Sequence, residues 1–114
     1  MRLRPSSPRL LIIGCGDVGL RVLRLLGGRL PVFALSSSPA RFEALRAAGA
    51  TPLWGDLDRP ETLARLAGLA DRVLHLAPPQ NQGREDQRTL NLLRALARDR
   101  APQALVYAST TGVY

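Results

Sequence analysis

The sequence of 114 residues contains no lysine, because all sixteen of its basic residues are arginine. It also has a single cysteine and a single histidine. One cysteine cannot form an intrachain disulfide, which is typical of a reducing compartment, and we therefore predict a cytoplasmic location. The histidine, His75, has neither an acid nor a serine adjacent to it, so the residues indicate no Ser-His-Asp triad and no metal site.

Long apolar runs are also missing from the sequence. No apolar stretch approaches the roughly 20 residues of a membrane-spanning helix, so we expect no membrane partner. Residues 1–8, MRLRPSSP, lack the apolar core of a signal peptide and are predicted to form a flexible tail. Residues 9–114 are long enough for one domain with its own hydrophobic core, but short for a complete dehydrogenase.

The formal net charge of +7 raises the question of nucleic-acid binding. The arginines are scattered along the chain, and aromatic residues make up only 4% of it. Tracking of a phosphate backbone needs clustered cations, and binding of single strands needs aromatic stacking platforms. We therefore interpret the arginines as a solvated outer surface and expect no nucleic-acid partner.

Short apolar runs alternate with helical patterns from residue 9 onward. The runs predict strands at 9–13, 31–35, 51–54, 72–77 and 103–109. Helical spacing, prolines near helix starts and glycines after helix ends predict helices at 17–28, 38–48, 58–69 and 85–100. This alternation predicts an α/β fold with a doubly wound parallel sheet, Rossmann-like in its strand order 3-2-1-4-5, between two helical layers.

Apolar spacing also predicts which face two of the helices bury. In the helix at 17–28, the shared face comprises Val18, Val22, Leu25 and Leu26. In the helix at 85–100, the buried stripe comprises Leu90, Leu93, and Leu96 or Ala97. The stretch 58–61, Asp-Arg-Pro-Glu, resembles a capping box at the start of the third helix.

Residues 14–19, GCGDVG, carry the spacing G-x-G-x-x-G between a predicted strand and a predicted helix. In that context Gly14 permits a tight turn, Gly16 lets the backbone approach a pyrophosphate, and Gly19 lets the helix pack closely on the strand. The N–H groups at the helix start would face the anion. The alternative is a purely structural turn. We predict a dinucleotide site formed here by Gly14, Cys15, Gly16, Asp17, Val18 and Gly19.

Two members of this turn have alternative interpretations. Cys15 lies beside a helix N-terminus, which favours a reactive thiol, but a small side chain lining the phosphate turn explains it more simply. Asp17 suits the first turn of a helix, where a negative charge stabilises the dipole.

The end of the second predicted strand indicates the type of dinucleotide. An acid there would bind the ribose hydroxyls of NAD. The sequence instead has Ser36, Ser37 and Ser38, followed by Arg41. Hydroxyls and a guanidinium donate hydrogen bonds to an anion, which suits the 2′-phosphate of NADP. We therefore favour NADP over NAD as the cofactor, the alternative being that the serines form only a polar loop and a helix cap.

Three further stretches follow in order: GDLD at 55–58, VLHLAPP at 73–79 and LVYASTTGVY at 105–114. With the glycine turn, they resemble the NAD(P)-dependent epimerase/dehydratase branch, extended or atypical, of the short-chain dehydrogenase/reductase superfamily. The resemblance implies that Asp56 accepts from the adenine amino group, with Leu57 beside the ring. It places Ala77 and Pro78 against the adenosine ribose and phosphates, and Thr110 at the catalytic Ser/Thr position.

The sequence departs from that family in two places. Position 13 is isoleucine, so the turn is not the G-x-x-G-x-x-G form that is usual in extended members, which points to an atypical subgroup. The Tyr-x-x-x-Lys pair, in which lysine lowers the tyrosine pKa for proton exchange, is absent because there is no lysine. We therefore expect residues 9–114 to be the N-terminal cofactor-binding part of a longer oxidoreductase or nucleotide-sugar epimerase/dehydratase-like enzyme with a small-molecule substrate, truncated and inactive alone.

The sequence is also compatible with two other functions. A stand-alone nucleotide-sensing regulatory domain, resembling those of potassium-transport systems, also uses G-x-G-x-x-G. Such domains normally keep an acid after the second strand, and the stretch STTGVY has no purpose in them. An interaction domain with a vestigial cofactor site is the third alternative.

Overall fold

Five parallel strands form one sheet in this computed structural model, which describes residues 9–14, 16–76, 87–99 and 102–107. The strands are β1 (Leu10–Ile13), β2 (Val32–Ser36), β3 (Thr51–Trp54), β4 (Arg72–His75) and β5 (Ala104–Tyr107). Their order is β3-β2-β1-β4-β5, and every pairing is parallel. The predicted fold class and strand order are therefore confirmed.

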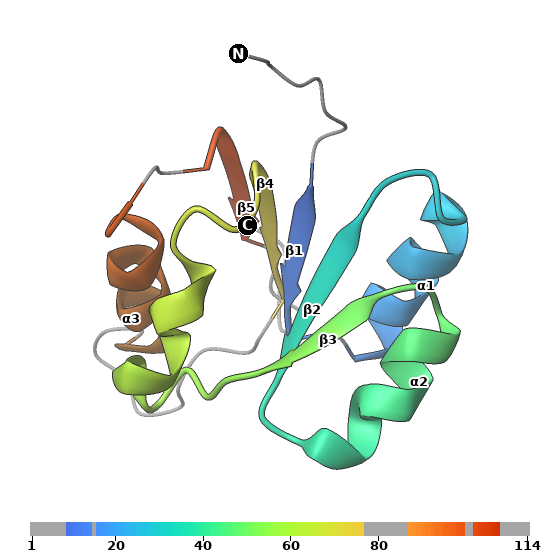
Figure 1. Ribbon diagram of the computed structural model, residues 1–114, viewed down its shortest axis with the longest axis horizontal. Coiled ribbons are helices and arrows are strands. Elements are labelled where there is room, and N and C mark those ends of the chain that lie inside the picture. The colour runs from blue at the N-terminus through green and yellow to red at the C-terminus, as the bar shows by residue number, and fades with distance from the viewer. Residues whose placement is uncertain (1–8, 15, 77–86, 100–101, 108–114) are drawn as a thin grey trace.

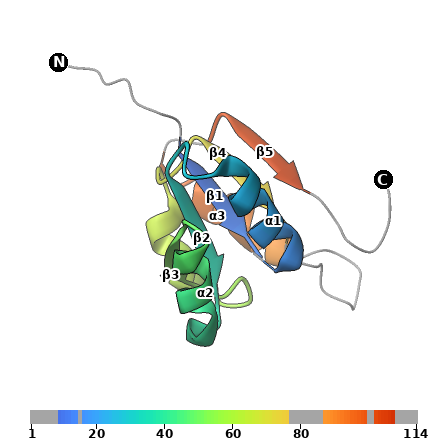
Figure 2. The same ribbon diagram turned by 90° about the vertical axis from the view of Figure 1, so that its right-hand side faces the viewer.

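Helical segments cover both faces of the sheet (Figure 1). On one face lie α1 (Asp17–Leu26) and α2 (Phe42–Ala47), the latter preceded by a 3-10 turn, η1 (Pro39–Arg41). On the other lie the 3-10 helix η2 (Pro60–Leu66) and α3 (Gln87–Leu96). Figure 2, viewed from the side of α1 and α2, shows β3 and β5 at opposite edges of the sheet. The arrangement has the three predicted layers.

The central strand β1 is buried on both faces, which explains its continuous apolar sequence. Leu11 and Ile13 point into the core beneath η2 and α3, whereas Ile12 points into the core beneath α1 and α2. All three are at most 1% exposed. A parallel strand at the centre of a sheet has no solvent face, so polar alternation is absent.

The predicted buried face of α1 is wrong at two positions. Val18 is 47% exposed and Leu25 is 79% exposed, whereas Gly19 and Leu23 are buried. Gly19 has no side chain, which lets the helix approach the sheet on that side. The apolar arc of α1 is also wider than the strip of sheet that it covers, so spacing alone did not identify the buried members.

The predicted face of α3 is wrong in a similar way. Leu93 is 39% exposed and Ala97 is also exposed, whereas the buried residues are Asn91, Leu92, Ala95 and Leu96. Helix α3 packs against η2 as well as against the sheet, so its buried residues are those that face both neighbours.

The segment after β3 differs from the prediction in type and in capping. It is a 3-10 helix that ends at Leu66, and its N-cap is Arg59, without a side-chain cap hydrogen bond. The predicted capping box is therefore wrong, because the Asp58 carboxylate pairs with Arg88 instead. In the part of the chain that the structure describes, no helix is long and apolar enough to cross a membrane.

Candidate functional site

A cavity of about 450 Å³ opens at the carboxyl ends of β1, β2 and β3. Ligands of open parallel α/β sheets bind at this edge, outside the strand ends. Four segments contribute: the turn after β1, the end of β2 with η1, the loop after β3, and the start of α3. The described residues that line the cavity are Ile13, Gly14, Gly16, Leu35, Ser36, Ser37, Arg41, Gly55, Asp56, Leu57, Asp58 and Arg88.

Gly14 and Gly16, which lie between β1 and α1, line this cavity. Gly14 has a φ of 78°, which favours glycine because a Cβ is strained there. The Gly16 amide donates to the Gly14 carbonyl over 2.9 Å, and the Gly16 carbonyl accepts from Leu20 as α1 begins. A Cβ built on Gly16 meets no atom within 4 Å, so the space in front of this backbone is open. The turn therefore presents bare backbone at a helix N-terminus, which suits a phosphate group.

The end of β2 presents serines and one arginine to the cavity. The hydroxyl of Ser36 accepts from the Ser38 amide over 3.1 Å and so closes the turn into η1. Ser37 is exposed, and its carbonyl accepts from Nε1 of Trp54 over 3.2 Å. Arg41, at the end of η1, is exposed and lines the same cavity. Ser37 and Arg41 therefore place a hydroxyl and a guanidinium, both donors to an anion, beside the cavity.

The loop after β3, residues 55–58, lines the cavity beside the end of β2, where the Gly55 amide donates to the Ser36 carbonyl over 3.1 Å. Hydrogen bonds within the loop and to the start of η2 hold its conformation. The Asp56 amide donates to Oγ1 of Thr62 over 2.9 Å, and the Thr62 hydroxyl donates to the Arg59 carbonyl over 2.8 Å. Oδ1 of Asp56 accepts from the Asp58 amide over 2.9 Å. Leu57 is only 8% exposed. The loop therefore holds the Asp56 carboxylate in a fixed conformation, and Leu57 lines the cavity although most of its surface is buried in the core.

Two residues of α3 that the sequence did not indicate contact this loop. Arg88 forms a two-pronged ion pair with Asp58, with Nε to Oδ1 at 3.0 Å and Nη2 to Oδ2 at 3.2 Å. The Asn91 side chain donates to the Leu57 carbonyl over 2.7 Å. The sequence held one signal for Asn91, because it is a polar residue inside the apolar run 90–93 of a predicted helix.

His75 lies in strand β4, as predicted, and is buried against α3. It is 1% exposed, its Nε2 lies 3.0 Å from Oγ1 of Thr89, and its ring stacks on Tyr107 with centroids 4.3 Å apart. Within the described ranges, no three His, Cys, Asp or Glu side chains are grouped so as to hold a metal ion.

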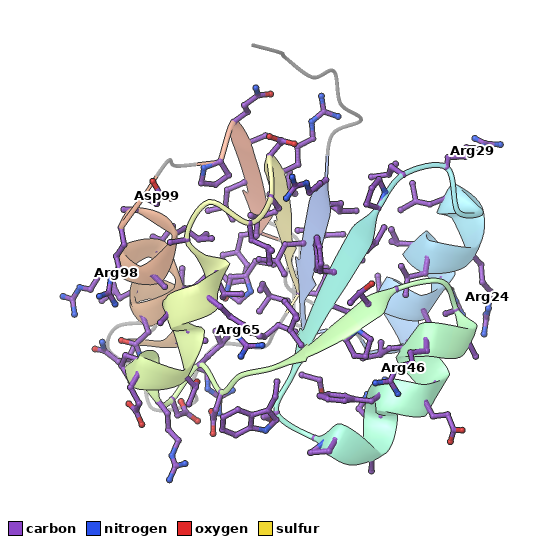
Figure 3. The ribbon with its side chains drawn as sticks, in the orientation of Figure 1. Arg24, Arg29, Arg46, Arg65, Arg98 and Asp99 are labelled. Carbon is purple, nitrogen blue, oxygen red and sulfur yellow. The ribbon has the colours of Figure 1, made fainter. Side chains whose placement is uncertain are left out.

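The structure brings seven of the predicted site residues together around the cavity: Gly14, Gly16, Ser36, Ser37, Arg41, Asp56 and Leu57. Asp17, Val18 and Gly19 form the first residues of α1, and Ser38 is the N-cap of η1. Cys15, Ala77, Pro78 and Thr110 lie outside the described residues. The arginines are spread over both sides of the molecule, with Arg24, Arg29 and Arg46 on the side of α1 and α2 and Arg65 and Arg98 on the other (Figure 3).

A protein-family comparison matches residues 10–109 to the TrkA-N domain. The chain belongs to the TrkA-N domain family. This TrkA-N domain is a Rossmann-type NAD(P)-binding domain, in agreement with the predicted dinucleotide cofactor. A comparison with curated protein sequences finds no match.

Solved structures of several reductases share the fold of this TrkA-N domain. A new type of NADPH-dependent quinone oxidoreductase from Escherichia coli is 22% identical with a TM-score of 0.68, over 86% of this chain and 34% of that one. The triphenylmethane reductase from Citrobacter sp., complexed with NADP(H), is 23% identical with a TM-score of 0.67, over 87% and 36%. A short-chain dehydrogenase/reductase from Veillonella parvula is 15% identical with a TM-score of 0.69, over 94% and 49%. The chain thus spans a third to a half of their length.

Proposed function

We propose that this TrkA-N domain binds NADP(H) and is the cofactor-binding part of an oxidoreductase that acts on a small-molecule substrate. The observation that carries the choice of NADP is the pair Ser37 and Arg41 beside the cavity, in a segment without any carboxylate. A guanidinium and a hydroxyl stabilise a 2′-phosphate by donated hydrogen bonds, whereas a ribose diol needs an acceptor.

In this proposal, different residues around the cavity bind different parts of the dinucleotide. The pyrophosphate would be held by the backbone of Gly14 and Gly16 at the start of α1, and the adenine by Asp56 and Leu57. When bound, the nicotinamide supplies or accepts a hydride. The protein contributes orientation through the glycine turn, charge neutralisation through Arg41, and an apolar wall through Leu57.

The finer assignment to the epimerase/dehydratase branch is part of the same proposal. It is supported by the resemblance of the stretch LVYASTTGVY, in which Thr110 would hydrogen-bond the substrate oxygen. In this assignment residues 9–114 are one cofactor-binding domain, and the acid/base tyrosine lies in another part of the full-length enzyme. The 114-residue chain would therefore bind cofactor without turning it over.

A nucleotide-sensing regulatory domain is the second candidate, and the TrkA-N family match favours it equally. In that function the same cavity binds a dinucleotide or a related adenine nucleotide, and binding itself is the signal. The two candidates differ at β2, because sensing of NAD is expected to use an acid where this chain has Ser36 and Ser37.

Calorimetric titration of the purified chain with NADP, NAD and ADP-ribose tests both candidates. Preference for NADP over NAD by about tenfold or more is the expected result for a 2′-phosphate site. Tighter binding of NAD would contradict the argument from Ser37 and Arg41. Absence of binding to all three nucleotides would contradict both candidates, and hydride transfer to a small carbonyl compound by this chain would contradict its predicted inactivity.

A further inference from the structure

Helix α3 touches the loop 55–58 at two points, although this helix lies more than 28 residues further along the chain. Asn91 donates to the Leu57 carbonyl over 2.7 Å, and Arg88 forms its two-pronged ion pair with Asp58. The two residues are one helical turn apart on the same face of α3. The loop is therefore held from the helix as well as by its own hydrogen bonds.

Asn91 is an unusual residue for its place. It is 6% exposed and lies beside the core residues Leu92 and Ala95. Burial of an amide costs free energy unless its hydrogen bonds are made inside the protein. Both ends of this amide are used, since Nδ2 donates to Leu57 and Oδ1 accepts from Nε2 of Gln87 over 3.0 Å. The second bond fixes the orientation of the amide, so that its N–H group points to the loop.

The hydrogen bond from Asn91 completes a clamp on the loop. Thr62 of η2 holds the backbone at Asp56, and Asn91 of α3 holds it at Leu57, the next residue. All four residues of the loop line the cavity. Within the described part of the chain, Oδ1 of Asp56 accepts the Asp58 amide and no donor reaches Oδ2, which leaves one carboxylate oxygen for a ligand.

We propose that Asn91 is a positioning residue for the adenine-binding wall: it fixes the backbone at Leu57 so that Asp56 and Leu57 meet the adenine in a preformed geometry. This inference rests on the proposed binding of a dinucleotide. Preformed walls raise affinity because less conformational freedom is lost on binding. Asn91 is buried behind the loop and acts on the ligand only through it.

The test compares three variants. Asn91→Leu removes the donor at similar size, and Asn91→Ser is a smaller alternative that cannot reach the Leu57 carbonyl. Thr89→Val is the matched control, since it also removes a side-chain hydrogen bond of α3, but the one to His75 in β4. General loosening of the helix would affect all three variants, whereas loss of positioning affects only those at Asn91.

Two ligands distinguish an effect on the adenine-binding loop 55–58 from an effect on the glycine turn. Affinity for ADP-ribose is expected to fall by about tenfold in both Asn91 variants, the usual cost of a lost buried hydrogen bond. Affinity for inorganic pyrophosphate, measured by NMR titration, is expected to stay within about twofold, because that ligand does not need the loop. Unchanged ADP-ribose affinity in Asn91→Leu, or an equal loss in Thr89→Val, would overturn the inference.

Amide hydrogen exchange of the ligand-free protein gives an independent readout. The amides of Asp56, Asp58 and Arg59 all donate to acceptors inside the loop and its junction with η2. They are expected to exchange roughly tenfold faster in the Asn91 variants and at the wild-type rate in Thr89→Val. If the wild-type chain binds no nucleotide, the proposed function fails, and unchanged exchange in Asn91→Leu would still overturn the positioning role by itself.

Discussion

A Cβ atom on residue 55 would lie 2.6 Å from Cδ1 of Leu35, so any side chain in place of Gly55 would force the Leu35 side chain or the loop after β3 to shift. Leu63 approaches from another side, at 3.4 Å from the same point. Leu35 is 3% exposed and Leu63 is fully buried, so neither side chain can move into solvent. The close contact lies where the loop joins the end of β2, next to the hydrogen bond from the Gly55 amide to the Ser36 carbonyl.

Gly55→Ala is therefore expected to destabilise the protein. The added methyl group overpacks a buried junction, which typically costs about 1–3 kcal/mol of the free energy of unfolding. It would also shift the loop at Asp56 and so weaken nucleotide binding. Chemical denaturation monitored by circular dichroism measures the first effect, and calorimetry below the unfolding temperature measures the second. A variant as stable as the wild type would contradict this packing.

Gly16→Ala is expected to behave in the opposite way. A Cβ at Gly16 meets no protein atom within 4 Å, so the substitution is expected to change stability by less than about 1 kcal/mol. The same methyl group would stand in the cavity, where the proposed pyrophosphate must approach the backbone.

Binding of ADP-ribose to Gly16→Ala is accordingly expected to weaken by about tenfold or more. Comparison with Gly55→Ala separates loss of affinity from loss of stability, because only one of the two variants should lose both. Wild-type affinity in Gly16→Ala would show that the glycine turn is structural and does not contact a phosphate.

Local sequence patterns predicted the strands, the helices and their alternation, because burial of a strand and the end of a helix depend on residues close together in the sequence. Apolar runs such as 9–13 mark strands buried on both faces, and glycines mark the ends of helices, so the alternation and its strand order followed. The buried faces of α1 and α3 did not follow. Which part of an apolar arc is covered depends on the neighbours of the helix, and Val18 and Leu93 lie beyond the covered part.

The candidate site was predictable to the same extent. The glycine turn and the end of β2 are motifs of residues close together in the sequence. The structure places several residues of these motifs around one cavity. Arg88 could not be predicted as a member, because it meets Asp58 across 30 positions of the chain. The polar residue Asn91 inside an apolar run was a signal, but its partner lies 34 positions away and could not be named from the sequence. Contacts of that kind depend on how α3 packs against the loop, which no local pattern describes.

Arg41→Glu tests the choice of cofactor. Reversal of the charge beside the proposed 2′-phosphate is expected to reduce affinity for NADP by at least about tenfold and to leave NAD within about threefold. Arg46→Glu is the matched control, because it makes the same change in net charge at an exposed position of α2 away from the cavity. Isothermal titration of each variant with both dinucleotides provides the measurement. An equal effect of the two variants would show that NADP responds only to the overall charge.

The stacked pair His75 and Tyr107 links β4 to β5 and gives a prediction on stability. His75→Phe keeps an aromatic ring on Tyr107 but loses the hydrogen bond to Thr89, and is expected to cost about 1 kcal/mol of the free energy of unfolding. His75→Leu also loses the aromatic pair and is expected to cost roughly 1 kcal/mol more. Urea denaturation of the two variants measures the difference.

Combination of His75→Phe with Thr89→Val tests the hydrogen bond directly. If the two side chains stabilise the protein mainly through each other, the double variant is expected to be about as stable as the less stable single variant. Strictly additive losses would mean that each residue acts through other contacts, and that the 3.0 Å approach of Nε2 to Oγ1 contributes little.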